Sequence, residues 1–147
     1  MEIYDRFVTL GGLRFHYREV GDPEGHPAVL LHALGSGCSD WDEVAQALAP
    51  EHRVLAFELR GSFASPRTER YSFELMRDDT RDLVDELGLD QFSLVGHSMG
   101  GTVAYLLAEE QLVEVARRIP SCRLIGLGGG HHVHTERRGE FVAAVLG

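Results

Sequence analysis

Residues 92–101 read Phe-Ser-Leu-Val-Gly-His-Ser-Met-Gly-Gly, and the rest of the chain is organised around this stretch. Strand-forming residues enter its Gly-x-Ser-x-Gly pattern and helix-compatible residues leave it, which is the context that a nucleophilic serine requires. The turn is tight enough to predict a strained backbone at Ser98, with its hydroxyl exposed. Gly96 and Gly100 are expected where the strand and the helix approach each other closely. An ordinary glycine-rich loop is the alternative interpretation, and the flanking elements favour the nucleophile.

Composition sets limits on the class of protein. The chain has 147 residues, of which 44% are hydrophobic and 25% charged, as in one globular domain. A net charge of −9 argues against nucleic acid or an anionic membrane as a partner. We find no apolar signal core at the N-terminus and no run long enough to span a membrane. Cys38 and Cys122 form no disulfide framework, so we expect a cytoplasmic protein.

Strands and helices alternate along the chain, which predicts an α/β fold: a mostly parallel, twisted sheet of about six strands with flanking helices. The first two strands should form a hairpin through Gly11 and Gly12. The expected strands are residues 3–10, 13–20, 28–31, 53–57, 92–95 and 123–127, and the expected helices are 41–48, 72–87 and 102–108.

Three local signals give expectations within these elements. Ser39 or Asp40 should cap the first helix, and Ser72 should cap the second, which ends at Gly88. His16 alternates with arginines along a strand pattern typical of a half-exposed strand. We therefore expect His16 to be solvated rather than to act as a ligand.

Several motifs together resemble the α/β-hydrolase fold family, of the serine esterase type. Residues 32–35 are similar to the family's oxyanion loop, 57–62 to its Asp-x-Arg-Gly-His-Gly loop, and 96–101 to its nucleophile elbow. Residues 122–147 resemble its C-terminal end, where Gly-His precedes a Glu-Arg pair. The resemblance implies that Ser98 is the nucleophile and His131 the general base. It also implies that the backbone N–H groups of Leu34 and Met99 form the oxyanion hole.

The resemblance also shows what the chain lacks. A cap and two late strands would normally lie between the elbow helix and the last strand. We therefore interpret residues 1–147 as one truncated domain with a deletion junction near residues 108–112. The apolar stripes on either side of the junction are displaced around the helix axis, which supports this interpretation. A simple helix bend is the alternative.

The family's catalytic acid would lie in the missing segment, so the acid is unknown. Glu58 and Glu136 are the nearest substitutes, although each is better explained as a structural or solvated residue. Replacing the acid of a known triad lowers kcat about 10⁴-fold, so we predict low activity unless another carboxylate serves.

The expected reaction is hydrolysis of small carboxylic esters through an acyl-enzyme on Ser98, without a cofactor. One alternative is a non-enzymatic or nearly inactive scaffold, and another keeps the enzyme but makes it a C–C hydrolase, lactonase or perhydrolase. His131, His132 and His134 could together hold zinc, but no Cys or His-Glu-x-x-His pattern supports a metal site. An open sheet edge left by the missing strands predicts a homo-oligomer, with exchange of the segment after Glu110 as one route.

Overall fold

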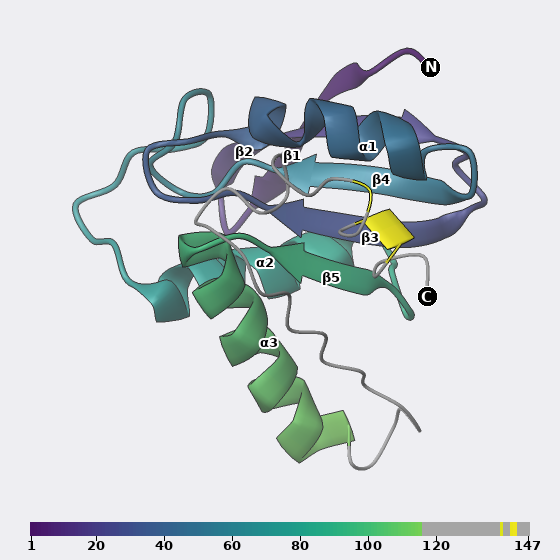
Figure 1. Ribbon diagram of the computed structural model, residues 1–147. Helices are drawn as coiled ribbons and strands as arrows, with labels where there is room; N and C mark the ends of the chain where they lie inside the picture. Colours follow the sequence, from purple (N-terminus) through teal and green to yellow (C-terminus); the bar gives the residue numbers. More distant parts are fainter. Residues whose placement is uncertain (116–138, 140–141, 144–147) are drawn as a thin grey trace.

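The computed structural model describes residues 1–115, 139 and 142–143, which form a mixed sheet with helices on both faces (Figure 1). Its five strands lie in the order β1-β2-β4-β3-β5, which confirms the α/β class. The predicted strand at residues 123–127 lies outside the described residues. In chain order the elements are β1 (Tyr4–Leu10), β2 (Leu13–Gly21), β3 (His26–Leu31), the 3-10 helix η1 (Cys38–Trp41), α1 (Asp42–Leu48), β4 (His52–Phe57), α2 (Phe73–Glu86), β5 (Ser93–Gly96) and α3 (Met99–Val115).

The sheet has an antiparallel half and a parallel half. β1 and β2 form the predicted hairpin, in which Gly11 and Gly12 have φ angles of +54° and +81°. Two consecutive positive φ angles are those of a type I′ turn, which suits the twist of a hairpin. β2 also pairs antiparallel with β4, whereas β3 pairs parallel with both β4 and β5. The parallel order expected from the sequence therefore applies to β4, β3 and β5.

Both faces of the central strands are buried, as in other sheets covered by helices on both sides. On β3, Leu30 packs with Trp41 on the face covered by α1. Leu31 points the other way and packs with Leu83 of α2 and Val103 of α3. Figure 1 shows this three-layer arrangement, with α1 on one side of the sheet and α2 and α3 on the other. The first residues after β3, β4 and β5, which are His32, Glu58 and His97, are buried as well.

The helix ends agree with the sequence for α2 but not for α1. The Ser72 hydroxyl accepts a hydrogen bond from the Leu75 N–H at 3.0 Å, and Gly88, with φ +66°, follows the last turn. The prediction that Ser39 or Asp40 caps α1 is wrong. Residues 38–41 instead form η1, and Trp41 occupies the N-cap position of α1 without a capping hydrogen bond from its side chain. This tight turn places the side chains of both Cys38 and Trp41 in the core.

α3 begins immediately after Ser98, three residues earlier than the sequence predicts, and continues to Val115. It therefore passes without interruption through residues 108–112, where we expect a deletion junction. A continuous helix is compatible with a junction and with an undivided natural helix, so the deletion stays a prediction. Within the described part of the chain, no helix combines the length and the apolarity needed to cross a membrane.

Candidate active site

The turn between β5 and α3 holds Ser98 in a left-handed backbone conformation, with φ +53°. Residues with a β-carbon rarely adopt this conformation, which costs roughly 1–2 kcal/mol. Ser98 is exposed, and Met99 after it is the first residue of α3. The predicted strain and the predicted exposure of the serine are both confirmed. Strain of this kind persists where the surrounding structure holds it in place.

Glycines close this turn by direct contact between backbones. A β-carbon added to Gly96 would overlap the carbonyl group of Gly100, and one added to Gly100 would overlap the carbonyl of Leu31. The His97 N–H donates to the Leu31 carbonyl at 3.0 Å, and the Gly100 N–H donates to the His97 carbonyl at 2.9 Å. The expected close approach of strand and helix is therefore confirmed. These contacts hold the start of α3 against the end of β3.

The carboxyl ends of the three parallel strands meet at one edge of the sheet. Leu31 at the end of β3 is in register with Phe57 of β4 and with Gly96 of β5. The loops that follow carry the three motifs on which the sequence analysis depends. Ligands of open α/β sheets bind outside the carboxyl ends of the strands, so this edge is the candidate active site.

Leu34 lies in the loop after β3 and is 81% exposed. A turn closed by the Ser36 N–H and the Ala33 carbonyl, at 3.2 Å, contains it. Gly35 in the same turn has φ +74°. The other expected oxyanion donor, Met99, stands at the start of α3, where backbone N–H groups have no acceptor within the helix. Leu34 and Met99 therefore both follow parallel strands at the same edge of the sheet, and their role as donors stays a prediction.

His32 fixes the loop that carries Leu34. Its ring is 1% exposed, its Nδ1 lies 2.8 Å from the Ala33 carbonyl, and its Nε2 accepts from the Leu59 N–H at 3.0 Å. These partners require a neutral ring with the hydrogen on Nδ1. Burial lowers the pKa of His32 and favours this neutral form. The histidine thus joins the loop after β3 to the loop after β4.

Arg60 holds the loop after β4 in place from the other side. Its Nε and Nη2 donate to the two carboxylate oxygens of Asp79 in α2, at 2.8 and 2.7 Å. Two parallel charge-assisted hydrogen bonds of this kind fix direction as well as distance. The motif at residues 57–62 is therefore tied both to the loop after β3 and to α2.

The remaining predicted site residues have different outcomes. His131 and Glu136 lie outside the described residues, so the position of the general base stays a prediction.

Glu58, the first residue after β4, is 3% exposed, and its carboxylate is fully engaged. Its Oε2 accepts from the Ala64 N–H at 3.0 Å and lies 2.9 Å from His16 Nδ1. Its Oε1 accepts from the Cys38 thiol at 3.4 Å. These contacts favour the structural role that the sequence analysis prefers for Glu58.

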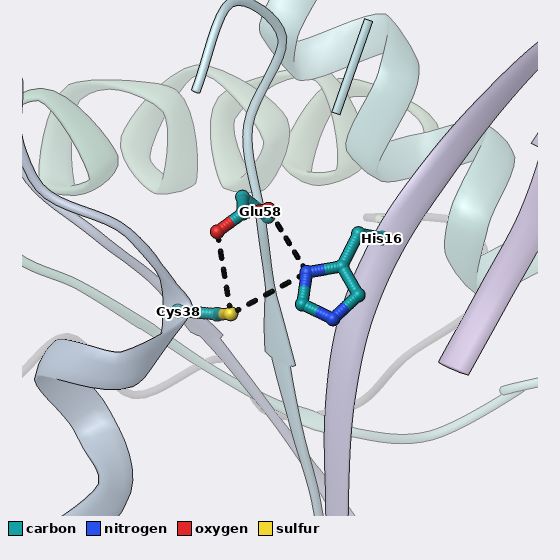
Figure 2. A group of neighbouring side chains, drawn as sticks. All are labelled: His16, Cys38 and Glu58. Carbon is teal, nitrogen blue, oxygen red and sulfur yellow. Dashed lines mark hydrogen bonds and ion pairs between the residues drawn. The ribbon is translucent and has the colours of Figure 1, made fainter. Parts of the chain in front are cut away.

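His16 contradicts the prediction of a solvated strand residue, because it is only 7% exposed. Its Nδ1 faces Glu58 (Figure 2). Its Nε2 lies 2.8 Å from Asp5 Oδ1 of β1. The alternation along β2 was assigned correctly, since Phe15 and Tyr17 face the side covered by α2. The opposite face, however, is also covered there, by η1. Alternation indicates which residues share a face, but it does not reveal whether that face is open to solvent.

The structure contains a side-chain cluster that no sequence motif indicates. It is formed by His16, Cys38 and Glu58, and we call it the His-Cys-Glu cluster. Its residues come from β2, η1 and the end of β4, and all three are buried. Burial raises the pKa of the Cys38 thiol to about 12, and the negative charge of Glu58 adds to the rise. The hydrogen bond from His16 lowers the pKa of the Asp5 carboxyl, and Arg18 adds to this effect. No local sequence motif indicates the cluster, because about twenty residues separate each member from the next along the chain.

The comparisons with known proteins agree with this geometry. Residues 27–137 match the family described as alpha/beta hydrolase fold, and the chain belongs to this family. It is 36% identical to a soluble epoxide hydrolase of Corynebacterium sp. (strain C12), over 73% of this chain and 37% of the relative. It is 34% identical to the sn-1-specific diacylglycerol lipase ABHD11 of Mus musculus, over 85% of this chain and 40% of the relative.

A solved structure is also similar to this chain. An alpha/beta hydrolase from Novosphingobium aromaticivorans superposes with a TM-score of 0.70 and 32% sequence identity, covering 76% of this chain and 41% of that one. This chain therefore spans less than half the length of the relatives that it matches. The three relatives described above are all named as hydrolases or as a lipase.

Proposed function

We propose that this protein is a serine hydrolase that cleaves small carboxylic esters through an acyl-enzyme on Ser98. The observation that carries the proposal is the backbone of Ser98, which is left-handed, exposed and followed directly by a helix. Such strain has no benefit for a serine that merely forms a turn, where a glycine would serve at lower cost. It does present a hydroxyl to a substrate above the carboxyl ends of the strands.

In the proposed reaction, His131 takes the proton of the Ser98 hydroxyl as the oxygen attacks the ester carbonyl. The N–H groups of Leu34 and Met99 stabilise the oxyanion, and loss of one such donor typically costs about 2.7–4 kcal/mol. The histidine then protonates the leaving alcohol. Water repeats the cycle and releases the acid. His131 supplies the base by resemblance alone, and no carboxylate is assigned to orient it.

The chemistry of serine favours an ester over an epoxide, although most of the similar curated proteins and solved structures are named as epoxide hydrolases. Attack by a serine oxygen on a carbonyl gives an ester intermediate, which water can hydrolyse. Attack on an epoxide carbon would give an ether, which water cannot cleave under these conditions, and the enzyme would remain alkylated. The diacylglycerol lipase among the relatives has a name that specifies an ester. We therefore extend ester hydrolysis, and not epoxide hydrolysis, to this chain.

A fluorophosphonate probe tests the nucleophile, because it reacts with activated serines. We expect the full chain to be labelled at Ser98 and to hydrolyse a short p-nitrophenyl ester. Ser98→Ala should lose both signals and fall to the uncatalysed rate. Ser39→Ala, at an exposed serine outside the elbow, is the matched control and should keep both. Equal labelling of the parent and Ser98→Ala would overturn the assignment.

A folded parent that is neither labelled nor active would instead support the alternative of a nearly inactive scaffold. A C–C hydrolase, lactonase or perhydrolase would be labelled but would prefer other substrates. We also propose the cytoplasmic location and the homo-oligomer expected from the sequence. In the described part of the chain, β5 lies at the edge of the sheet, which is compatible with assembly through that edge. Light scattering that finds only monomers at high concentration would contradict the oligomer.

A further inference from the structure

The His-Cys-Glu cluster brings three chemically different metal ligands to one point on the face of the sheet covered by η1 and α1 (Figure 2). Cys38 Sγ lies 3.4 Å from Glu58 Oε1 and 3.7 Å from His16 Nδ1. His16 Nδ1 lies 2.9 Å from Glu58 Oε2. A thiol, an imidazole and a carboxylate therefore converge, each from a different segment of the chain.

These separations are close to those of ligands around a tetrahedral zinc ion. Sulfur, nitrogen and oxygen bind Zn²⁺ at about 2.0–2.3 Å, so that two ligands lie roughly 3.3–3.7 Å apart. Both separations from the sulfur lie in this range. The nitrogen–oxygen separation is shorter because a hydrogen bond joins the two atoms. A cation in place of that hydrogen requires only a small separation of the two side chains.

Asp5 already orients the histidine as a metal site requires. Its Oδ1 lies 2.8 Å from His16 Nε2, and this contact leaves Nδ1 directed at Cys38 and Glu58. Histidines that bind metals usually donate their second ring N–H to a carboxylate in this manner, which fixes the ring and strengthens the ligand. The arrangement is therefore a ligand set together with its supporting carboxylate.

We propose that His16, Cys38 and Glu58 bind one zinc ion, with a water molecule as the fourth ligand. Mixed sulfur, nitrogen and oxygen ligands suit Zn²⁺, whereas Ca²⁺ and Mg²⁺ select oxygen alone and Cu⁺ selects sulfur. A thiolate and a carboxylate together neutralise the charge of Zn²⁺, which a buried position requires. Binding requires a thiolate at Cys38 and a free lone pair at His16 Nδ1, so the thiol hydrogen of Cys38 is released to solvent.

Such a zinc ion would act on structure rather than on the substrate, because all three ligands are buried. It would tie β2, η1 and the loop after β4 to one another. Leu59, the residue next to Glu58, donates its N–H to His32, which holds the loop of Leu34. The proposed metal would therefore stabilise the support of the candidate oxyanion loop. The inference does not depend on the proposed ester hydrolysis.

Zinc stoichiometry tests the site. The full chain is produced with Zn²⁺ present, passed over a desalting column with a weak chelator, and analysed by elemental mass spectrometry. We expect one zinc per chain in the parent and none in Cys38→Ala. Cys122→Ala is the matched cysteine control, and the double variant His132→Asn/His134→Asn removes the competing histidines. Both should keep one zinc and a melting temperature that Zn²⁺ raises.

A metal-free parent, or a Cys38→Ala protein that keeps its zinc, would overturn the proposal and leave a hydrogen-bonded cluster only. If Cys38→Ala does not fold, Cys122→Ala loaded with Co²⁺ gives an independent answer. Cys38 is then the sole thiol of the chain, so a thiolate-to-cobalt charge-transfer band must come from it. A cobalt-loaded protein without this band would contradict the site.

Discussion

The serine elbow and the His-Cys-Glu cluster lie at the same end of the sheet but are built in opposite ways. The elbow is made by consecutive residues, 96–101, and depends on backbone contacts between glycines. The cluster is made by three side chains from β2, η1 and the end of β4. The elbow exposes a strained serine, whereas the cluster buries three polar groups that satisfy one another.

This difference separates reactivity from support. An exposed hydroxyl on a strained backbone can form hydrogen bonds with a substrate. The free-energy cost of the backbone strain is offset by favourable contacts elsewhere in the fold. A buried polar group is retained only where its partners compensate for the loss of water. We therefore expect substitutions at the elbow either to prevent folding by steric overlap or to abolish activity. Substitutions in the cluster should lower the free energy of unfolding.

The largest effect is expected at Gly100. A methyl group there overlaps the Leu31 carbonyl, and backbone on both sides cannot yield without opening the junction of β3 and α3. We expect Gly100→Ala to yield no stably folded protein, as seen by circular dichroism and chemical denaturation. Gly101→Ala is the matched control, because its β-carbon would lie 3.3 Å from its nearest neighbour, the Gly96 carbonyl. Similar stability of the two variants would show that the elbow is not closed as described.

Glu58→Ala should have the next largest effect. It leaves buried His16 and the Ala64 N–H without their partner, and breaking a buried pair costs about 3–5 kcal/mol. Asp5→Ala removes the other carboxylate from the same histidine, but the Asp5 side chain is 59% exposed. The cost there should be at most about 1 kcal/mol. Urea denaturation with a chelator present measures the loss in free energy of unfolding for both variants. Equal losses would show that the buried Glu58 contacts stabilise the fold no more than the exposed Asp5 contact.

His32 connects the two regions and makes their stability depend on pH. Burial lowers its pKa in the folded state, and the hydrogen bond to the Ala33 carbonyl and the nearby acidic charges only partly oppose this effect. The unfolded state therefore binds more protons at acidic pH. Stability is fully present above the unfolded pKa of about 6.5 and falls as the pH decreases below it, by up to about 1.4 kcal/mol per pH unit.

His32→Gln tests this contribution, since its amide oxygen can still accept from the Leu59 N–H. Urea denaturation at pH 7.5 and at pH 5.5 (roughly one unit either side of the unfolded pKa) should show a smaller loss of stability for the variant than for the parent. An identical pH dependence for both proteins would exclude His32 as its source.

The smallest effect is expected at Ser98 itself. Glycine tolerates φ +53° without the cost that a β-carbon incurs, although it loses more chain entropy on folding. Ser98→Gly should therefore raise the free energy of unfolding by about 0.5–1 kcal/mol. Ser98→Ala keeps the β-carbon and should change it by less than about 0.5 kcal/mol. Thermal or urea denaturation that finds equal stabilities would show that the serine backbone is unstrained.

Much of the parallel half of the fold could be predicted from the sequence because its signals are local. Residues 28–31 and 54–57 are short apolar runs, and both lie in strands with two buried faces. The hairpin at Gly11 and Gly12, the cap at Ser72 and the elbow at Ser98 also follow from residues within a few positions. The hairpin, the cap and the φ angle of Ser98 are each specified by residues close together in the sequence.

The local geometry of the elbow follows from the sequence, because the steric limits on φ at Ser98 and the close contact of Gly96 with Gly100 act within a few residues. The contact of Gly100 with the Leu31 carbonyl, in contrast, depends on the assembled sheet. The environment of His16 likewise depends on the assembled fold. Its strand pattern states that it lies opposite Phe15 and Tyr17, but η1 and Glu58, which cover and engage it, come from segments far along the chain. Solvent exposure and ion pairing depend on what packs against a face, and that is a property of the assembled fold.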